Sequence, residues 1–313
     1  MLKILTGLPV TLQQREKLLA ACEGCKMSFK PLEEIKAEDV CDADAIIGNV
    51  SPELLQSAVR LRWLQLNSAG TDAYTKPGIL GEGVQLTNAV GAYGLVVAEY
   101  MVAAVLSIAK RLHTYRDHMH TGLWRDEGPV MSIAGSKTLV LGTGDIGTEF
   151  AKRMDALGST VWGIRRRAEE KKAPFEKLYS MEDLERLLPQ ADIVAVALPG
   201  LPELDRFFDR TKFAAMKNEA ILINAGRGNL IDQEALLEFL DQRAVFGAAL
   251  DVTEPEPLPA DSPLWDCPKL LITPHIAGGY HLPCVLENIV DLSAANIRRF
   301  TKGGTLLNRV QAR

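Results

Sequence analysis

Short apolar segments and amphipathic segments alternate along the first hundred residues. The apolar runs predict strands at residues 4–6, 44–48, 63–66 and 84–87. A helical pattern covers residues 12–21, and a shorter helix is expected to start at Pro52. This alternation predicts a small parallel sheet covered by helices. From residue 96 to residue 115 the pattern is that of one long helix, apolar first and charged later, which we expect to connect two domains.

A second series of strands and helices begins after residue 137. Apolar runs predict six strands, at residues 139–141, 161–164, 193–197, 220–223, 247–250 and 270–272. Helical patterns lie between them, notably at residues 181–188 and 232–240, and an amphipathic helix is expected at 282–300. Six strands interleaved with helices predict a doubly wound, dinucleotide-binding sheet. In the simplest topology residues 1–99 and 282–313 form one domain, and residues 100–281 form a second domain inserted into it.

The most specific motif is the glycine-rich turn that follows the strand at 139–141. It reads Gly142-Thr143-Gly144-Asp145-Ile146-Gly147 and precedes a helix-prone segment. In this order, Gly142 permits a tight turn, Gly144 lets backbone N–H groups approach a pyrophosphate, and Gly147 lets the helix pack on the strand. The turn therefore predicts a nicotinamide dinucleotide site that includes Asp145 and Ile146 at the helix start.

The next strand indicates which dinucleotide is preferred. An acidic residue about 20 positions beyond the glycines usually binds the adenosine ribose hydroxyls. Arg165 stands at that position and Arg166 follows it. A guanidinium can bind a 2′-phosphate through charge-assisted, bidentate hydrogen bonds, so we expect NADP(H) to be preferred over NAD(H). The alternative is a solvated basic loop balanced by Glu169 and Glu170.

Three later strand ends carry residues suited to hydride transfer. Arg227, Glu256 and His275 each follow a predicted strand. A substrate carboxylate needs a fork-shaped cation, and an alkoxide that forms during reduction needs a proton donor that titrates near neutral pH, such as histidine. A neighbouring carboxylate would orient the imidazole and favour its protonated form. Taken singly, the three residues have other interpretations: a surface charge, a loop acid and a structural histidine.

Composition and charge exclude several classes of protein. The chain has 313 residues, of which 47% are hydrophobic and 24% charged, with a formal net charge of −5. The length indicates two domains, and the mixed, slightly acidic charge argues against a nucleic-acid partner. No window reaches the ~18 apolar residues that a membrane span requires. Because no long apolar region follows the N-terminal segment, it does not have the pattern of a signal peptide, and we expect a cytoplasmic protein.

The cysteines and histidines suggest no metal site. Five cysteines without a secretory context are expected to be reduced thiols, although Cys22-x-x-Cys25 leaves a redox pair or metal ligands open. His118 and His120 lack a nearby third ligand, so we interpret them as part of a solvated polar face.

Taken together, these segments resemble the D-isomer-specific 2-hydroxyacid dehydrogenases over nearly the whole chain. The resemblance is carried by residues 142–147, 224–232, 249–259 and 271–278. It implies an α/β fold of two doubly wound parallel-sheet domains, with a Rossmann cofactor domain inserted into a discontinuous, flavodoxin-like substrate domain. It further implies that Arg227 binds and polarises the substrate, that His275 is the acid/base, and that Glu256 supports His275.

The same resemblance assigns further contacts. Residues 67–72 are similar to the substrate loop of the family, which implies that backbone N–H groups at Ala69 and Gly70 hold the substrate carboxylate. It also implies that Leu198 and Pro199 line the cofactor and that Asp251 lies near the nicotinamide.

Family members are usually homodimers joined through the cofactor domain. This implies a dimer contact in residues 96–124, from which Trp124 could reach the active site of the partner, although we favour a packing role for Trp124. One departure from the family pattern lies after His275: residues 277–281 lack the Ser or Thr often found there, and we do not expect His281 to be catalytic.

We therefore expect an NADP(H)-preferring D-2-hydroxyacid dehydrogenase that reduces a small 2-oxo acid. Arg165 in place of an acid resembles the glyoxylate/hydroxypyruvate reductase branch of the family. Three alternatives stay open: an NAD-dependent dehydrogenase of another 2-hydroxy acid, an enzyme that oxidises formate or phosphite on a related scaffold, and a non-catalytic, NAD(P)H-sensing interaction protein on the same fold.

Overall fold

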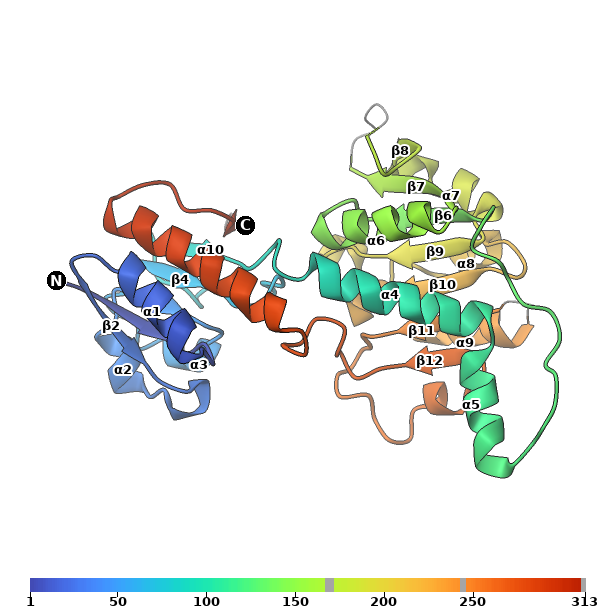
Figure 1. The fold of residues 1–313 in the computed structure, drawn as a ribbon, viewed down its shortest axis with the longest axis horizontal. Helices are drawn as coiled ribbons and strands as arrows, with labels where there is room; N and C mark the ends of the chain where they lie inside the picture. The colour runs from blue at the N-terminus through green and yellow to red at the C-terminus, as the bar shows by residue number, and fades with distance from the viewer. Residues whose placement is uncertain (167–171, 243–245, 311–313) are drawn as a thin grey trace. The chain divides into compact units, whose positions relative to one another are not determined.

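The chain forms two compact units, each built around its own sheet. The computed structural model describes residues 1–166, 172–242 and 246–310. The first unit comprises residues 1–93 and 280–313, and the second is the continuous segment 94–279 (Figure 1). The domain boundaries expected from the sequence, after residue 99 and after residue 281, stay a prediction.

The sheet of the first unit has the order β13-β5-β4-β3-β1-β2. Its strands are β1 (Leu2–Thr6), β2 (Cys25–Phe29), β3 (Ala45–Ile47), β4 (Trp63–Gln65), β5 (Gln85–Thr87) and β13 (Arg309–Val310). The first five are parallel, and β13 pairs antiparallel with β5. The parallel strands follow the order 2-1-3-4-5, which is the flavodoxin-like arrangement. This part of the expected fold class is confirmed.

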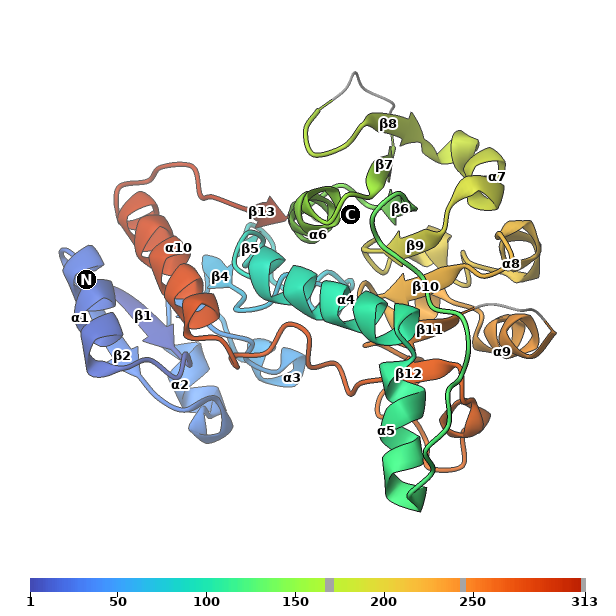
Figure 2. The ribbon, with the colours of Figure 1, turned by 45° about the vertical axis from the view of Figure 1, so that its right-hand side comes forward.

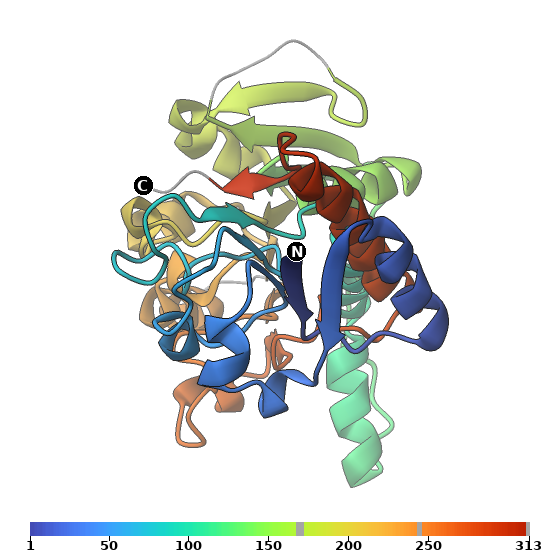
Figure 3. The same ribbon diagram turned by 90° about the vertical axis from the view of Figure 1, so that its left-hand side faces the viewer.

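Helices from both segments of the chain cover this sheet. They are α1 (Leu12–Ala21), α2 (Ala37–Cys41), α3 (Pro52–Leu55) and α10 (Pro283–Thr301), with a 3₁₀ turn at Leu32–Glu34. In Figure 3, α10 lies beside α1, and Gln14 and Lys17 of α1 both contact Glu287 of α10, at 2.9 and 2.6 Å. Within the core, Asn296 donates a 2.9 Å hydrogen bond to Gln65 of β4. The C-terminal segment therefore completes the first unit.

The sheet of the second unit has the order β12-β11-β10-β9-β6-β7-β8, and all seven strands are parallel. Its strands are β6 (Lys137–Leu141), β7 (Thr160–Arg165), β8 (Lys177–Ser180), β9 (Ile193–Val196), β10 (Ile221–Asn224), β11 (Gly247–Leu250) and β12 (Leu270–Ile272). Counted from β6, this is the 3-2-1-4-5-6 order of the Rossmann fold, extended by one strand. The expected cofactor-binding fold is confirmed.

Helices cover both faces of the second sheet. They are α4 (Gly94–Ala109), α5 (Leu112–Thr121), α6 (Asp145–Ala156), α7 (Leu184–Leu187), α8 (Arg210–Ala215) and α9 (Gln233–Gln242). In Figure 2, α4 and α6 lie side by side on one face, while α7, α8 and α9 lie on the other. Short 3₁₀ turns occur at Met181–Asp183, Leu188–Gln190, Pro202–Leu204, Gly228–Leu230 and Pro263–Asp266. Side chains of α7, α8 and α9 share one buried cluster with the strands.

Two expected helices differ in the structure. The single helix expected at 96–115 is wrong, because α4 ends at Ala109 and Arg111 adopts a left-handed backbone (φ +56°) before α5 starts. The helix expected at 181–188 is broken into one turn of α-helix between two 3₁₀ turns. Lys110 and Arg111 at the first break are polar and fit a solvated helix as well as a turn, so the pattern did not reveal that break.

The cysteines also differ from the expectation of reduced thiols. Cys22 and Cys25 form a disulfide between the end of α1 and the start of β2, with their Cα atoms 5.4 Å apart. Cys41, Cys267 and Cys284 are free thiols. Among the helices in the described parts of the chain, none is long and apolar enough to cross a membrane.

Candidate active site

The glycine-rich turn joins β6 to α6, and two of its glycines, Gly142 and Gly147, leave no room for a side chain. Gly142 has φ +96°, and a Cβ atom there would lie 2.5 Å from the Ala197 carbonyl oxygen. A Cβ atom at Gly147 would lie 1.9 Å from the Gly142 carbonyl oxygen, so α6 packs directly on the turn. Gly144 is the N-cap of α6 and supplies no side-chain cap. The N–H groups of Asp145 and Ile146, in the first turn, therefore lack intrahelical acceptors and can bind an anion.

The expected ribose-phosphate residues stand next to this turn. Arg165 is the last residue of β7, the strand beside β6, and is partly buried, while Arg166 is exposed. Arg167, Glu169 and Glu170 lie outside the described residues. Leu198 and Pro199 follow β9, the neighbour of β6 on its other side, and Leu198 is buried.

A buried asparagine shapes the turn that carries Arg227. Asn224, the last residue of β10, donates a 2.8 Å hydrogen bond from its amide to the Arg227 carbonyl. The same side chain accepts a 3.0 Å hydrogen bond from the Gly226 N–H. The Arg227 guanidinium is partly buried and donates to the Gly226 carbonyl at 2.7 Å. The sequence motif included Asn224, but only the fold shows that it fixes the backbone on both sides of Gly226.

His275 and Glu256 form the pair that the sequence suggested. The Nδ1 atom of His275 lies 2.8 Å from Oε2 of Glu256, and the His275 side chain is 51% exposed. The other carboxylate oxygen of Glu256 accepts a 3.0 Å hydrogen bond from the Thr253 N–H, which fixes the carboxylate on its own loop. With Nδ1 held in this way, Nε2 is the imidazole nitrogen that can exchange a proton with a bound molecule.

Asp251 organises the loop on which His275 lies. Its carboxylate is buried and accepts hydrogen bonds from the Thr273 hydroxyl (2.6 Å), the Ile276 N–H (2.9 Å) and the Ala277 N–H (3.0 Å). Its carbonyl accepts from the His275 N–H at 2.8 Å. This turn places His275 in the left-handed region, at φ +53°. The expected position of Asp251 near the nicotinamide stays a prediction, and no sequence pattern indicated its role in this loop.

Tyr100 of α4 extends the same network. Its hydroxyl lies 2.6 Å from the Thr273 hydroxyl, which already donates to Asp251, so Tyr100 is the donor of this contact. Burial raises the pKa of Tyr100 to about 12, so the hydroxyl stays protonated at neutral pH. Tyr100 was not predicted as a site residue, because no local signal links residue 100 to residue 273.

These groups of the second unit share one edge of its sheet. Each follows the carboxyl end of a parallel strand, and in doubly wound sheets ligands bind outside those ends. The residues on this edge are Gly142 after β6, Arg165 on β7, Leu198 after β9, Arg227 after β10, Glu256 after β11 and His275 after β12. Ala69 and Gly70, in contrast, belong to the first unit.

The loop with Ala69 and Gly70 has its carbonyl groups occupied. Tyr93 donates to the Asn67 carbonyl, the Ala89 N–H to that of Ser68 (2.9 Å), Asn88 to that of Ala69 (2.8 Å), and the Ser68 hydroxyl to that of Gly70 (2.7 Å). The N–H groups of Ser68, Ala69 and Gly70 have no acceptor among the residues that the structure describes. A short loop with bound carbonyls and open N–H groups is suited to bind a carboxylate.

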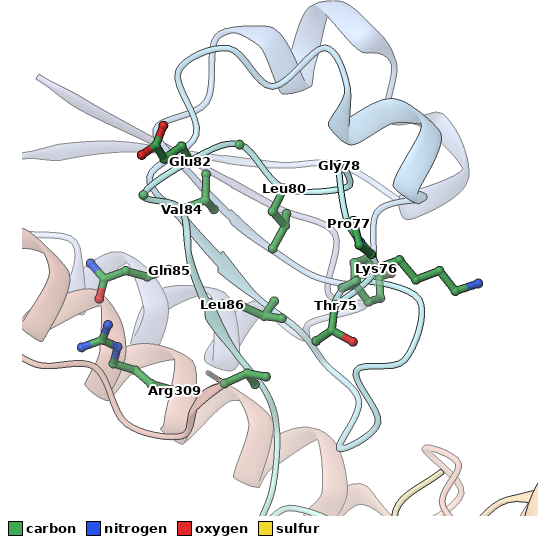
Figure 4. Close-up of a pocket in the computed structure, with 14 residues that line it drawn as sticks. Thr75, Lys76, Pro77, Gly78, Leu80, Glu82, Val84, Gln85, Leu86 and Arg309 are labelled. Carbon is green, nitrogen blue, oxygen red and sulfur yellow. The ribbon is translucent and has the colours of Figure 1, made fainter. Parts of the chain in front are cut away.

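A cavity of about 950 Å³ lies elsewhere, within the first unit. It is formed by residues 74–78 and 80–86 together with Arg309 and Val310. Leu80, Val84 and Leu86 lie on its walls, while Lys76 extends outward (Figure 4). None of the expected site residues lines it. Within the described ranges, no group of three or more His, Cys, Asp or Glu side chains could hold a metal ion.

Comparison with known proteins identifies the family. Residues 102–277 match the family model described as "D-isomer specific 2-hydroxyacid dehydrogenase, NAD binding domain". Glyoxylate/hydroxypyruvate reductase B of Klebsiella pneumoniae (strain 342) is 32% identical over 278 residues, which cover 84% of this chain and 85% of that protein. The chain belongs to the D-isomer-specific 2-hydroxyacid dehydrogenase family. The expected enzyme class, an NAD(P)-dependent 2-hydroxyacid dehydrogenase, is thereby confirmed.

Solved structures of this dehydrogenase family share the fold. A family protein from Aeromonas salmonicida is 31% identical, with a TM-score of 0.88 over 100% of this chain and 99% of that chain. A D-isomer-specific 2-hydroxyacid dehydrogenase from Xanthobacter autotrophicus Py2, solved in complex with NADPH and MES, is 26% identical, with a TM-score of 0.82 over 99% of this chain and 98% of that chain.

Proposed function

We propose that the protein is an NADP(H)-preferring reductase of a small 2-oxo acid such as glyoxylate or hydroxypyruvate, and that Arg227, Glu256 and His275 are its catalytic residues. The observation that carries the proposal is the 2.8 Å contact between His275 and Glu256 on the sheet edge that also carries the glycine-rich turn and Arg227. The relative from Klebsiella pneumoniae, a glyoxylate/hydroxypyruvate reductase by name, supports this choice of substrates.

The proposed mechanism assigns one task to each group. When bound at the turn 142–147, NADPH supplies the hydride that reduces the substrate carbonyl carbon. Arg227 binds the substrate and polarises its carbonyl, and the N–H groups of Ala69 and Gly70 bind its carboxylate. His275 donates a proton to the carbonyl oxygen, while Glu256 orients the imidazole through its contact with Nδ1.

The proposed preference for NADP(H) rests on Arg165. This residue ends the second strand of the Rossmann order, where an acid would otherwise bind the ribose hydroxyls of NAD(H). Arg166 follows it and is exposed. The complex of the Xanthobacter autotrophicus relative with NADPH supports the preference.

We also propose a homodimer formed through the second unit. Large apolar side chains are exposed on α5 and just after it: Leu112 (54%), Met119 (76%), Leu123 (43%) and Trp124 (102%). Exposed apolar groups gathered on one element are typical of an association surface. The composition is consistent with a cytoplasmic location, which stays part of the proposal.

The test is oxidation of NADPH and NADH in the presence of glyoxylate, hydroxypyruvate, pyruvate, phenylpyruvate and branched 2-oxo acids. A rate that depends on NADPH and on glyoxylate or hydroxypyruvate is the expected result. Reduction of another 2-oxo acid alone, or equal rates with NADH, would correct the substrate or the cofactor. No turnover in this panel, with NADPH bound, would contradict the proposed reductase and favour the NAD(P)H-sensing alternative.

A further inference from the structure

Two tyrosines stand where the chain leaves and re-enters the first unit. Tyr93 is the last residue before the second unit, and Tyr280 is the first residue after it. Both hydroxyl groups contact Asn67, the first residue of the loop 67–70. The Tyr93 hydroxyl donates to the Asn67 carbonyl, and the Asn67 side-chain amide donates to the Tyr280 hydroxyl at 2.5 Å. Asn67 and Tyr280, which are 213 positions apart in the sequence, are therefore in direct contact.

Asn67 is also bound from a third side, by Asn49. The Asn49 N–H donates to the Asn67 side-chain oxygen at 2.7 Å, and the Asn67 N–H donates to the Asn49 side-chain oxygen at 2.9 Å. The Asn49 amide donates to the Ser68 hydroxyl at 3.0 Å. Every polar group of Asn67, on backbone and side chain, thus has a partner. Such a residue has one preferred conformation, which fixes the start of the loop.

The environment keeps both tyrosines in the neutral form. Burial raises the pKa of Tyr93 and the pKa of Tyr280 above the ordinary value of tyrosine. A neutral phenol can donate to a carbonyl, as Tyr93 does, and accept from an amide, as Tyr280 does. Removing either hydroxyl would leave a polar group of Asn67 without its partner in a partly buried position. Asn67 would then fix the start of the loop 67–70 less firmly.

We propose that Tyr93 and Tyr280 are positioning residues that hold Asn67, and through it the N–H groups of Ala69 and Gly70 that bind the substrate carboxylate. The role of Ala69 and Gly70 rests on the proposed function. We call Tyr93, Tyr280 and Asn67 the tyrosine clamp. Because the two tyrosines stand at the two connections between the units, the conformation of the loop 67–70 depends on residues at both connections.

The experiment compares Tyr93→Phe and Tyr280→Phe with a matched control, Tyr74→Phe. Tyr74 lies in the same unit, is buried and also has a raised pKa, but it makes no contact with Asn67 in the described structure. We expect each clamp variant to raise the KM for the 2-oxo acid about tenfold, the effect of losing one buried hydrogen bond. We expect kcat and the Kd for NADPH to change less than about twofold, since neither tyrosine contacts the cofactor turn. The control should leave KM unchanged.

Hydrogen exchange of the backbone amides at residues 68–70 provides a second readout that does not depend on activity. The clamp predicts faster exchange in Tyr93→Phe and Tyr280→Phe than in the wild type or Tyr74→Phe. Unchanged KM and unchanged exchange in both variants would overturn the clamp. A wild type that reduces no 2-oxo acid would contradict the proposed function, whereas faster exchange in the two variants would still support the hold on the loop.

Discussion

At the scale of single residues, two carboxylates near His275 have different tasks. Glu256 is partly exposed and contacts the imidazole, so it fixes the orientation of that ring. Asp251 is buried and its oxygens accept from the hydroxyl and N–H groups of the loop. Glu256 orients the proposed proton donor, and Asp251 holds the loop that carries it.

The first prediction concerns His275. Replacement by Ala removes the proposed proton donor, so kcat should fall about 10²–10⁴-fold. The Kd for NADPH should stay within about threefold, since the cofactor turn after β6 is untouched. Steady-state kinetics and a fluorescence titration with NADPH measure the two quantities. An equal loss of turnover and of NADPH affinity, in a folded variant, would argue against the assigned role.

The second prediction concerns Arg165. Replacement by Asp should weaken NADPH binding and shift the preference toward NADH, because a carboxylate repels the 2′-phosphate and binds free ribose hydroxyls. The ratio of kcat/KM for the two cofactors is the measurement. Arg186→Asp is a matched control: Arg186 pairs with Asp183 at 2.7 Å on the surface of the same unit. If the ratio is the same in the wild type and in Arg165→Asp, the residue does not select the cofactor.

The sequence was most informative where chemistry depends on residue type at a strand end. Arg227, Glu256 and His275 could be chosen because each follows an apolar strand and suits one step of hydride transfer. The supporting hydroxyls could not be chosen. Tyr100 meets Thr273, and Tyr280 meets Asn67, across long stretches of chain, and no periodic pattern encodes such contacts.

At the scale of elements, the parallel strands in the interiors of the sheets were predicted well. The interior strand β11 has the predicted bounds, and so does the edge strand β12, because both are continuous apolar runs. Three strands were missed: β2, β8 and β13, each at or near the edge of its sheet. Edge strands are exposed on one side and mix polar with apolar residues, so their composition resembles that of loops.

The third prediction concerns the contact between α1 and β2. Because Cys22 and Cys25 form a disulfide, the unfolded, unreduced protein should offer three reactive thiols out of its five cysteines. Reduction before the assay should raise the number to five. Thiol titration in denaturant measures both states, and a Cys22→Ser, Cys25→Ser double variant should give three in either. Five thiols without reduction would show that the pair is not oxidised.

At the scale of the whole molecule, buried tyrosines predict loss of stability in alkali. Burial raises the pKa of Tyr74, in the first unit, and of Tyr100, in the second, to about 12. The unfolded chain ionises its tyrosines near pH ~10. A raised folded pKa means that this stability is fully present below about pH 10 and is lost as the pH rises toward about 12.

Urea unfolding at a series of alkaline pH values tests this fourth prediction. The midpoint for each unit should fall as the pH rises above ~10. In Tyr74→Phe the transition of the first unit should fall less steeply than in the wild type, because one ionisable group has been removed. A midpoint that does not vary over this range would contradict the raised values.

The insertion of one unit into the other has a consequence for synthesis on the ribosome. All residues of the second unit, 94–279, are made before the last part of the first unit exists. Until residues 280–313 emerge, Trp63 lacks the ring of Phe300, which lies 5.2 Å from it, and β5 lacks its neighbour β13. The first unit begins the chain but cannot complete its fold until residues 280–313 have been synthesised. The second unit is translated later than residues 1–93, yet it is the first that can complete its fold.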